Sequence, residues 1–304
     1  METISSEIEN VDGMGLRERL ACYAELTKPR IAFLLVLTAA AGFYMAPSAG
    51  LANIAIFVHS MIGISLLAFG VAALNQFIER ETDALMKRTA TRPLPTGKIS
   101  ARSAFIFGLI LCLASEFYLA YFVNVLTAVF GLVVIVGYVL MYTPLKLRTT
   151  ASTAIGAVPG AMPPLMGWTS ANDNLSDLVG AGILFLILFL WQFPHFLAIA
   201  TMYRDEYAQA GIKMLPAVEP DGRITARQIM LFTILLIPIS LAPVFFGMAG
   251  LIYASAAVLL GIWFLIASYK AAKSKTKESA RTLLLVSVLY LPLLFLVMVI
   301  NKTP

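Results

Sequence analysis

The stretch Leu74-Asn75-Gln76-Phe77-Ile78-Glu79-Arg80-Glu81-Thr82-Asp83 leaves an apolar run that is long enough to span a bilayer. Asn75, Glu79 and Asp83 are spaced i, i+4 and i+8, so on a helix their side-chain oxygens form one stripe. Such a stripe suits a hard cation like Mg²⁺, which binds a few protein oxygens together with water and substrate phosphates. Taken alone, the stretch is explained better by a solvated helix end with mixed charges.

The composition of the chain excludes the soluble classes of protein. Of its 304 residues, 60% are hydrophobic and only 13% are charged, and the mean hydropathy is +0.85. Soluble domains carry about 25% charged residues. The apolar runs also exceed the ~10-residue alternating segments of an outer-membrane barrel. We therefore predict an all-α fold, a polytopic bundle of helices embedded in a lipid bilayer.

Run lengths predict nine transmembrane helices in a single membrane-embedded domain over 27–304, after a polar arm over 1–26. The expected spans cover 31–46, 54–78, 102–122, 125–142, 153–168, 178–200, 229–248, 251–269 and 281–300. The acidic start of the arm matches neither a signal peptide nor an Arg-rich transit peptide. This favours a bacterial cytoplasmic (inner) membrane over a mitochondrial one.

The basic residues fall almost entirely on one side of these spans. The segment ahead of span one and the links after spans two, four, six and eight, counted to the first residue of the span that follows, hold 21 of the 22 Lys and Arg residues, and only Lys302 falls elsewhere. The positive-inside rule places such links in the cytoplasm. We expect a cytoplasmic N-terminus and a periplasmic C-terminus. The net charge of +5 is then a signal of topology, and no nucleic-acid partner is expected.

Two further polar clusters fall on the same predicted side. One, Tyr142-Thr143-Pro144-Leu145-Lys146-Leu147-Arg148, ends span four; the other runs from Trp191-Gln192-Phe193-Pro194-His195-Phe196 to Tyr203-Arg204-Asp205-Glu206-Tyr207 at the end of span six. Spans two and six thus both end in carboxylates beside cations. Two such sites suit Mg²⁺ ions that bridge a diphosphate. We expect the diphosphate to be a leaving group, because the chain has no Walker loop, nucleophile elbow or kinase motif.

Aromatic residues close to these clusters suit the other half of such a substrate. An isoprenoid tail would occupy a membrane-embedded cavity, and aromatic rings stabilise an allylic cation by cation–π contact. Phe77, Tyr138 and Tyr142 are the candidates, although each of them suits ordinary helix packing as well.

Six segments together resemble the membrane-intrinsic aromatic prenyltransferases, and within them the heme-farnesylating branch, the protoheme IX farnesyltransferases or heme O synthases. They cover most of the predicted cytoplasmic links, and they are specific as a set. The segments are Thr27-Lys28-Pro29-Arg30, Asn75-x₃-Glu79-x₃-Asp83, Met86-x-Arg88-Thr89-x₂-Arg92-Pro93-Leu94-Pro95, Tyr142-Thr143-Pro144-Leu145-Lys146, Trp191-Gln192-x-Pro194-His195-Phe196 and Tyr207-x₃-Gly211-x₂-Met214-Leu215-Pro216.

This resemblance implies that the farnesyl group of farnesyl diphosphate is joined to a vinyl group of protoheme IX (heme b), giving heme O and diphosphate. Mg²⁺ is the implied cofactor and heme b a substrate; a heme A synthase or terminal oxidase assembly is an implied partner. The implied metal ligands are Asn75, Glu79, Asp83, Asp205 and Glu206. The implied catalytic residues are Asn75, Glu79, Asp83, Arg88, Arg92, Lys146, His195 and Tyr207. The implied substrate-binding residues are Lys28, Arg30, Arg88, Arg92, Lys146, Arg148, His195 and Lys213.

The sequence departs from the broader superfamily in the second motif, which is Asp-x₃-Asp there. Tyr203 and Tyr207 stand in the corresponding places here, around Asp205 and Glu206. An acid-Tyr pair resembles the heme branch, but either acid remains a candidate for the metal. In the first motif, Glu79 stands where Asp is frequent, which gives a longer reach to the same ion.

Two other functions stay open at this point. One is a prenyltransferase for a quinone precursor such as 4-hydroxybenzoate, against which Trp191–Phe196 and the acid-Tyr pair argue. The other is a membrane transporter, a class that tends to place polar groups near the midplane, whereas these acids gather at one predicted surface. For His195, a role at the heme and a structural hydrogen bond to a neighbouring helix both stay open.

Overall fold

The structure is a computed structural model that describes residues 14–47, 53–173 and 178–303, and the elements within these ranges are helices. This confirms the all-helical class. Among the described residues, seven helical stretches are long and apolar enough to cross a membrane. They are α4 (Ile54–Ala84), α5 (Ala101–Phe122), the continuous stretch Val125–Leu145, α10 (Val179–Met202), α13 (Arg223–Phe245), α14 (Leu251–Ser274) and α15 (Lys277–Ile300).

The remaining two predicted spans take a different form. Helix α3 (Pro29–Met45) follows the short helix α2 (Leu16–Leu26) at a bend of 48°, and the pair counts as an eighth span. The predicted span 153–168 is divided into α8 (Ser152–Gly160) and α9 (Met162–Ala171), each too short to cross alone. Prolines explain the break, because Pro159, Pro163 and Pro164 interrupt the backbone ladder there. The count of nine spans is therefore not confirmed.

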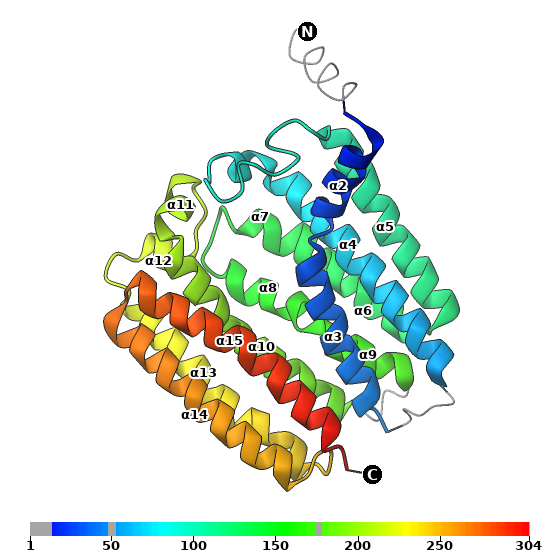
Figure 1. Ribbon diagram of the computed structural model, residues 1–304, viewed down its shortest axis with the longest axis vertical. Coiled ribbons are helices and arrows are strands. Elements are labelled where there is room, and N and C mark those ends of the chain that lie inside the picture. Colours follow the sequence, from blue (N-terminus) through cyan, green and yellow to red (C-terminus); the bar gives the residue numbers. More distant parts are fainter. Residues whose placement is uncertain (1–13, 48–52, 174–177, 304) are drawn as a thin grey trace.

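The helices form two cores that meet along a common seam (Figure 1). Helices α10, α13, α14 and α15 share one buried apolar cluster, centred on side chains such as Leu184, Tyr253 and Leu294. Helices α3, α4, α5, α6 (Val125–Ile135) and α9 share the other, which contains Leu67 and Met166. Segments from both cores line one large cavity between them.

The predicted fourth span changes its helical type before it ends. Helix α6 continues as a π-helix, η2 (Val136–Tyr142), and closes with the single turn α7 (Thr143–Leu145). The hydroxyl of Thr143 donates to the carbonyl of Tyr138 at 2.8 Å. π-Helical turns are rare and are frequent at functional sites. This one brings the rings of Tyr138 and Tyr142 to within 4.9 Å of each other on the cavity wall.

The links rich in basic residues gather at one end of the bundle, where α2, α7, α11 (Arg204–Gln209) and α12 (Leu215–Val218) also lie (Figure 1). Helix α15 ends at the opposite end of the bundle (Figure 1). The exceptional Lys302 follows it, and its ammonium donates to the carbonyls of Tyr44 and Ala46 at 2.7 and 2.9 Å. A cation at the C-terminal end of α3 complements the helix dipole. Desolvation lowers the pKa of this ammonium. Lys302 thus ties the end of α3 to the end of α15.

Helices α3 and α9 touch through their backbones at two glycines. A Cβ added to Gly167 would lie 1.8 Å from the carbonyl oxygen of Ala39, and one added to Gly42 would lie 2.0 Å from that of Pro164. Small residues permit this close approach, which drives helix association in membranes. The contact fixes one wall of the cavity, because Ala41 and Met166 from the same two helices line it.

We predict that Gly167→Ala lowers the unfolding free energy by about 2 kcal/mol, because the added methyl group meets rigid backbone. Gly182→Ala on α10 is the matched control, since its Cβ would enter open space. That change should leave stability unchanged or raise it by about 0.5 kcal/mol. Thermal melting in detergent measures both variants, and equal melting temperatures would contradict the close packing of α3 on α9.

Candidate active site

Each of the three oxygen-bearing residues of the predicted stripe receives a hydrogen bond from a different cation. Lys28 donates to Oδ1 of Asn75 at 2.8 Å, and Lys146 donates to Oε1 of Glu79 at 2.6 Å. Arg92 donates to Oδ2 of Asp83 at 2.6 Å. The cations come from three separate segments, namely the α2–α3 bend, the end of α7 and the loop after α4. The stripe therefore joins these segments at the basic end of the bundle.

Desolvation disfavours the charge of both lysines, but their different neighbours shift the two pKa values in opposite directions. Desolvation disfavours the charge of Lys146, but the neighbouring Glu79 carboxylate, Tyr142 and Tyr138 hold the pKa of its ammonium well above the usual value. The Lys146 ammonium also lies over the Tyr142 ring, 4.4 Å from its centroid. Desolvation lowers the pKa of Lys28 to about 8, although Glu79 opposes the shift.

The Asp83 carboxylate has one oxygen that can still accept a ligand. Its Oδ2 is paired with Arg92, whereas its Oδ1 is buried and has no hydrogen-bond partner. A buried carboxylate oxygen without a partner is costly unless a cation or a donor reaches it. Within the part of the chain that the structure describes, no three His, Cys, Asp or Glu side chains are grouped as a metal site by themselves. With the oxygen of Asn75 on the same helix face, the set fits a hard cation that also takes phosphate and water ligands.

The second predicted cluster lies against the loop that follows the stripe. The carboxylate of Glu206 accepts from the backbone N–H of Arg88 at 3.2 Å. The Arg88 guanidinium donates to the Tyr207 hydroxyl at 3.2 Å and lies over the Tyr203 ring. Asp205 instead pairs with Arg204 and leaves 98% of its side chain exposed. Of the two acids that the sequence left open, Glu206 is the one that contacts the loop after the stripe.

The other predicted cations do not take part in these contacts. Arg30, Arg148 and Lys213 are exposed, and the cations that contact the stripe are Lys28, Arg92 and Lys146. Lys213 contributes through its backbone, because its N–H donates to the carbonyl of Lys146 at 2.7 Å. This bond joins the link after α7 to the link after α11.

A cavity of about 730 Å³ extends from the stripe into the membrane-spanning part of the bundle. Its polar end holds Thr27, Lys28 and Asn75, and the rest of its wall is mainly apolar. Tyr138 and Tyr142 line it, as expected of residues that contact a substrate. Phe77 does not line it and packs on Phe105, with ring centroids 5.2 Å apart. The cavity therefore combines a charged end with an apolar body, which suits a charged lipid-like molecule.

His195 lines the same cavity on α10. Its ring stacks on Trp191 with centroids 4.5 Å apart, and its Nδ1 lies 2.8 Å from the hydroxyl of Ser287 on α15. Trp191 is fixed as well, because its indole N–H donates to the carbonyl of Ser287 at 2.9 Å. Sequence reasoning missed Ser287, whose only signal is a lone hydroxyl in an apolar run.

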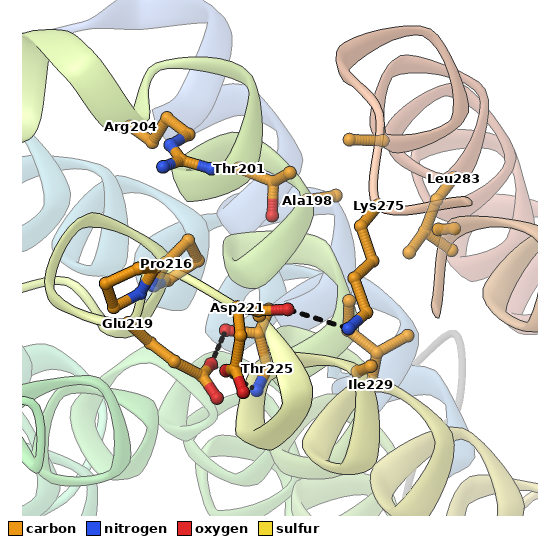
Figure 2. A pocket seen from close by; sticks show the side chains of 15 residues that line it. Ala198, Thr201, Arg204, Pro216, Glu219, Asp221, Thr225, Ile229, Lys275 and Leu283 are labelled. Carbon is orange, nitrogen blue, oxygen red and sulfur yellow. Dashed lines mark hydrogen bonds between the residues drawn. The ribbon is translucent and has the colours of Figure 1, made fainter. Parts of the chain in front are cut away.

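A second, smaller cavity of about 190 Å³ lies near the basic end, between α10, α13 and α15 (Figure 2). Polar groups of its wall form hydrogen bonds within the protein. The Glu219 carboxylate accepts from the backbone N–H and the hydroxyl of Thr225, at 2.9 and 2.8 Å, in the first turn of α13. Lys275 donates to the carbonyl of Asp221 at 2.7 Å. These contacts serve to start α13 and to join it to the end of α14.

Residues 35–298 match the sequence profile of the UbiA prenyltransferase family. The chain belongs to the UbiA prenyltransferase family. A protoheme IX farnesyltransferase of Solibacter usitatus is 47% identical to this UbiA chain over 288 residues, covering 92% of the chain and 98% of the relative. That of Myxococcus xanthus is 42% identical over 282 residues, covering 92% of the chain and 94% of the relative.

Solved UbiA structures share the fold at low sequence identity. A digeranylgeranylglyceryl phosphate synthase superposes with a TM-score of 0.77 at 18% identity, covering 93% of this chain and 98% of that one. A UbiA homologue from Archaeoglobus fulgidus, bound to DMAPP and Mg²⁺, gives a TM-score of 0.63 at 18% identity and covers 91% of this chain and 98% of its own. The fold of this UbiA chain is thus that of membrane prenyltransferases.

We predict that Lys146→Met lowers the unfolding free energy by about 3 kcal/mol, because the largely buried Glu79 carboxylate loses the ammonium that pairs with it at 2.6 Å. Adding Glu79→Gln in the same chain should restore most of the loss. Arg80→Met is the control, since the Arg80–Glu81 pair is exposed and its loss should cost less than about 1 kcal/mol. Chemical or thermal unfolding in detergent measures all variants. A double variant no more stable than Lys146→Met would show that the two groups are not coupled.

Proposed function

We propose that this chain joins the farnesyl group of farnesyl diphosphate to a vinyl group of protoheme IX, giving heme O and diphosphate. The observation that carries the proposal is the identity of 42–47% to relatives named protoheme IX farnesyltransferase over nearly their whole length. The charged end and apolar body of the cavity support it, since both substrates combine anionic groups with a large apolar surface.

In this proposal, the stripe and its cations exchange partners when substrate binds. Asn75, Glu79 and Asp83, together with Glu206, would hold Mg²⁺, and the unpaired Oδ1 of Asp83 supports this choice. Lys28, Lys146, Arg92 and Arg88 would bind the diphosphate. Mg²⁺ supplies charge neutralisation of the leaving diphosphate when it is bound. Because every stripe residue is already paired with a cation, metal and diphosphate should bind cooperatively.

The proposed reaction breaks the bond between C1 of the farnesyl group and the diphosphate oxygen. The electron pair leaves with the diphosphate, which the lysines and arginines stabilise as its charge develops. The allylic cation lies near Tyr138 and Tyr142, whose ring faces favour a positive charge. The terminal vinyl carbon of heme b then bonds to C1. Water adds to the neighbouring carbon and loses a proton, which completes the hydroxyethylfarnesyl side chain.

The apolar wall around His195 is the proposed heme site. His195, Trp191 and Phe196 come from one face of α10, and Val288, Leu291 and Pro292 come from the facing α15. Because α10 and α15 pack side by side, a flat apolar macrocycle in the cavity would lie against this shared wall. The position of His195 on this wall supports a contact with the heme, and Arg30 and Arg148, exposed at the basic end, are candidates for the heme propionates.

The two alternative functions have less support. A transporter would place its polar groups near the midplane, and the buried ion pairs lie at the basic end of the bundle. A quinone-precursor prenyltransferase would share the diphosphate end but not a histidine stacked on a tryptophan in the cavity.

The proposed setting is the bacterial inner membrane, with the N-terminus in the cytoplasm and the C-terminus in the periplasm. The gathering of basic links at one end supports this orientation, and reporter fusions after residues 90 and 250 should read as cytoplasmic and periplasmic. A heme A synthase or terminal oxidase assembly is the proposed partner for the product, which co-purification from membranes tests.

The test of function incubates the purified chain with heme b, farnesyl diphosphate and Mg²⁺ and separates the hemes by chromatography. We expect a heme with the added mass of a farnesyl group and one hydroxyl group. Prenylated 4-hydroxybenzoate in a parallel reaction, without heme O, would overturn the proposal in favour of the quinone pathway.

We predict that Asp83→Ala abolishes turnover, a loss of at least about 100-fold, because it removes both the metal oxygen and the partner of Arg92. Asp205→Ala is the matched control, since its side chain is exposed and should keep nearly full activity. Full activity of Asp83→Ala, or of wild type in EDTA, would contradict the metal assignment.

A further inference from the structure

The hydrogen bonds around Ser287 determine which nitrogen of His195 carries the proton. The Ser287 hydroxyl donates to the carbonyl of Leu284 at 2.7 Å, one turn earlier on α15. A serine hydroxyl has a single hydrogen, so Ser287 can only accept from its second partner. That partner is Nδ1 of His195 at 2.8 Å. Nδ1 therefore carries the proton in the neutral ring, and Nε2 keeps its lone pair.

Two further contacts fix the ring itself. Trp191 stacks on His195 with an interplanar angle of 24°, and the Trp191 indole is held by its hydrogen bond to the carbonyl of Ser287. Both residues are on α10, and both form hydrogen bonds with Ser287 of α15. Ser287 is fully buried, whereas His195 lines the large cavity. The protonated Nδ1 thus makes its hydrogen bond to Ser287 on α15, and Nε2 is the ring nitrogen that remains for a ligand in the cavity.

A neutral imidazole with one nitrogen donating to the protein and the other free is the form in which histidine binds metals. Iron of a heme takes such a nitrogen as an axial ligand. We infer that Ser287 is a positioning residue that holds His195 in the Nδ1–H tautomer, so that Nε2 ligates the iron of heme b in the cavity. This inference rests on the proposed function, which makes heme b a substrate.

The experiment binds heme b to the full chain in detergent and records its resonance Raman spectrum in the ferrous state, together with optical titrations of heme affinity. We expect an iron–histidine stretching band in wild type and its loss in His195→Ala. In Ser287→Ala the band should shift to lower frequency, because Nδ1–H no longer donates to Ser287 and the ring becomes a weaker base. Heme affinity should fall roughly tenfold.

Ser115→Ala is the matched control, because Ser115 is a fully buried serine on α5 that donates to the carbonyl of Gly63, outside the cavity. It should share any general loss of stability and leave the iron–histidine band and the heme affinity unchanged. Ser287→Thr, which keeps a hydroxyl, should restore the wild-type frequency. Should a Ser287 variant not fold, imidazole added to His195→Gly should restore the band and thus test the ligation separately.

The inference is overturned if wild type with heme b has no iron–histidine band, or if Ser287→Ala changes band and affinity no more than Ser115→Ala does. Heme O formation in the same preparation separates this failure from a failure of the proposed function. Heme O formed without the band rejects the axial ligand and leaves farnesyl transfer standing. The band with its Ser287 dependence, but without heme O, supports the ligand and rejects the reaction.

Discussion

The pairing of one cation with each residue of the Asn75–Glu79–Asp83 stripe is the interaction on which the arrangement of the basic end depends. Buried charges are stable only when they are paired and hydrogen-bonded. Here the partners come from the α2–α3 bend, the turn after the π-helix and the loop after α4. The same pairs that satisfy the carboxylates thus fix the positions of three links. They also place Lys28 and Asn75 at the polar end of the cavity, where we propose that the diphosphate binds.

Each of the two apolar cores of the bundle carries one half of the candidate site. The core of α3, α4 and α9 carries the stripe and the close contact at Gly167, and the core of α10 and α15 carries His195 and Ser287. The cavity lies where these cores meet, so each contributes one wall. A large substrate between them would contact the charged end and the histidine wall together. This explains why the functional residues are spread over most of the chain.

The stripe was predictable from sequence, because helical spacing alone puts residues i, i+4 and i+8 on one face. The choice between Asp205 and Glu206 was not, since successive helical residues point about 100° apart and the start of α11 decides which one faces Arg88. The division of 153–168 was also missed, although its prolines signal it. Ser287 was beyond prediction, because its role depends on the register of α15 against α10.

The most direct test of the exchange of partners in the stripe is a calorimetric titration of Mg²⁺ into the wild-type protein, with and without a non-cleavable thio analogue of farnesyl diphosphate. If the cations leave the stripe for the diphosphate, the analogue should raise the affinity for Mg²⁺ by roughly tenfold or more, and Mg²⁺ should raise the affinity for the analogue by the same factor. Equal Mg²⁺ affinity in the presence and absence of the analogue would contradict the account.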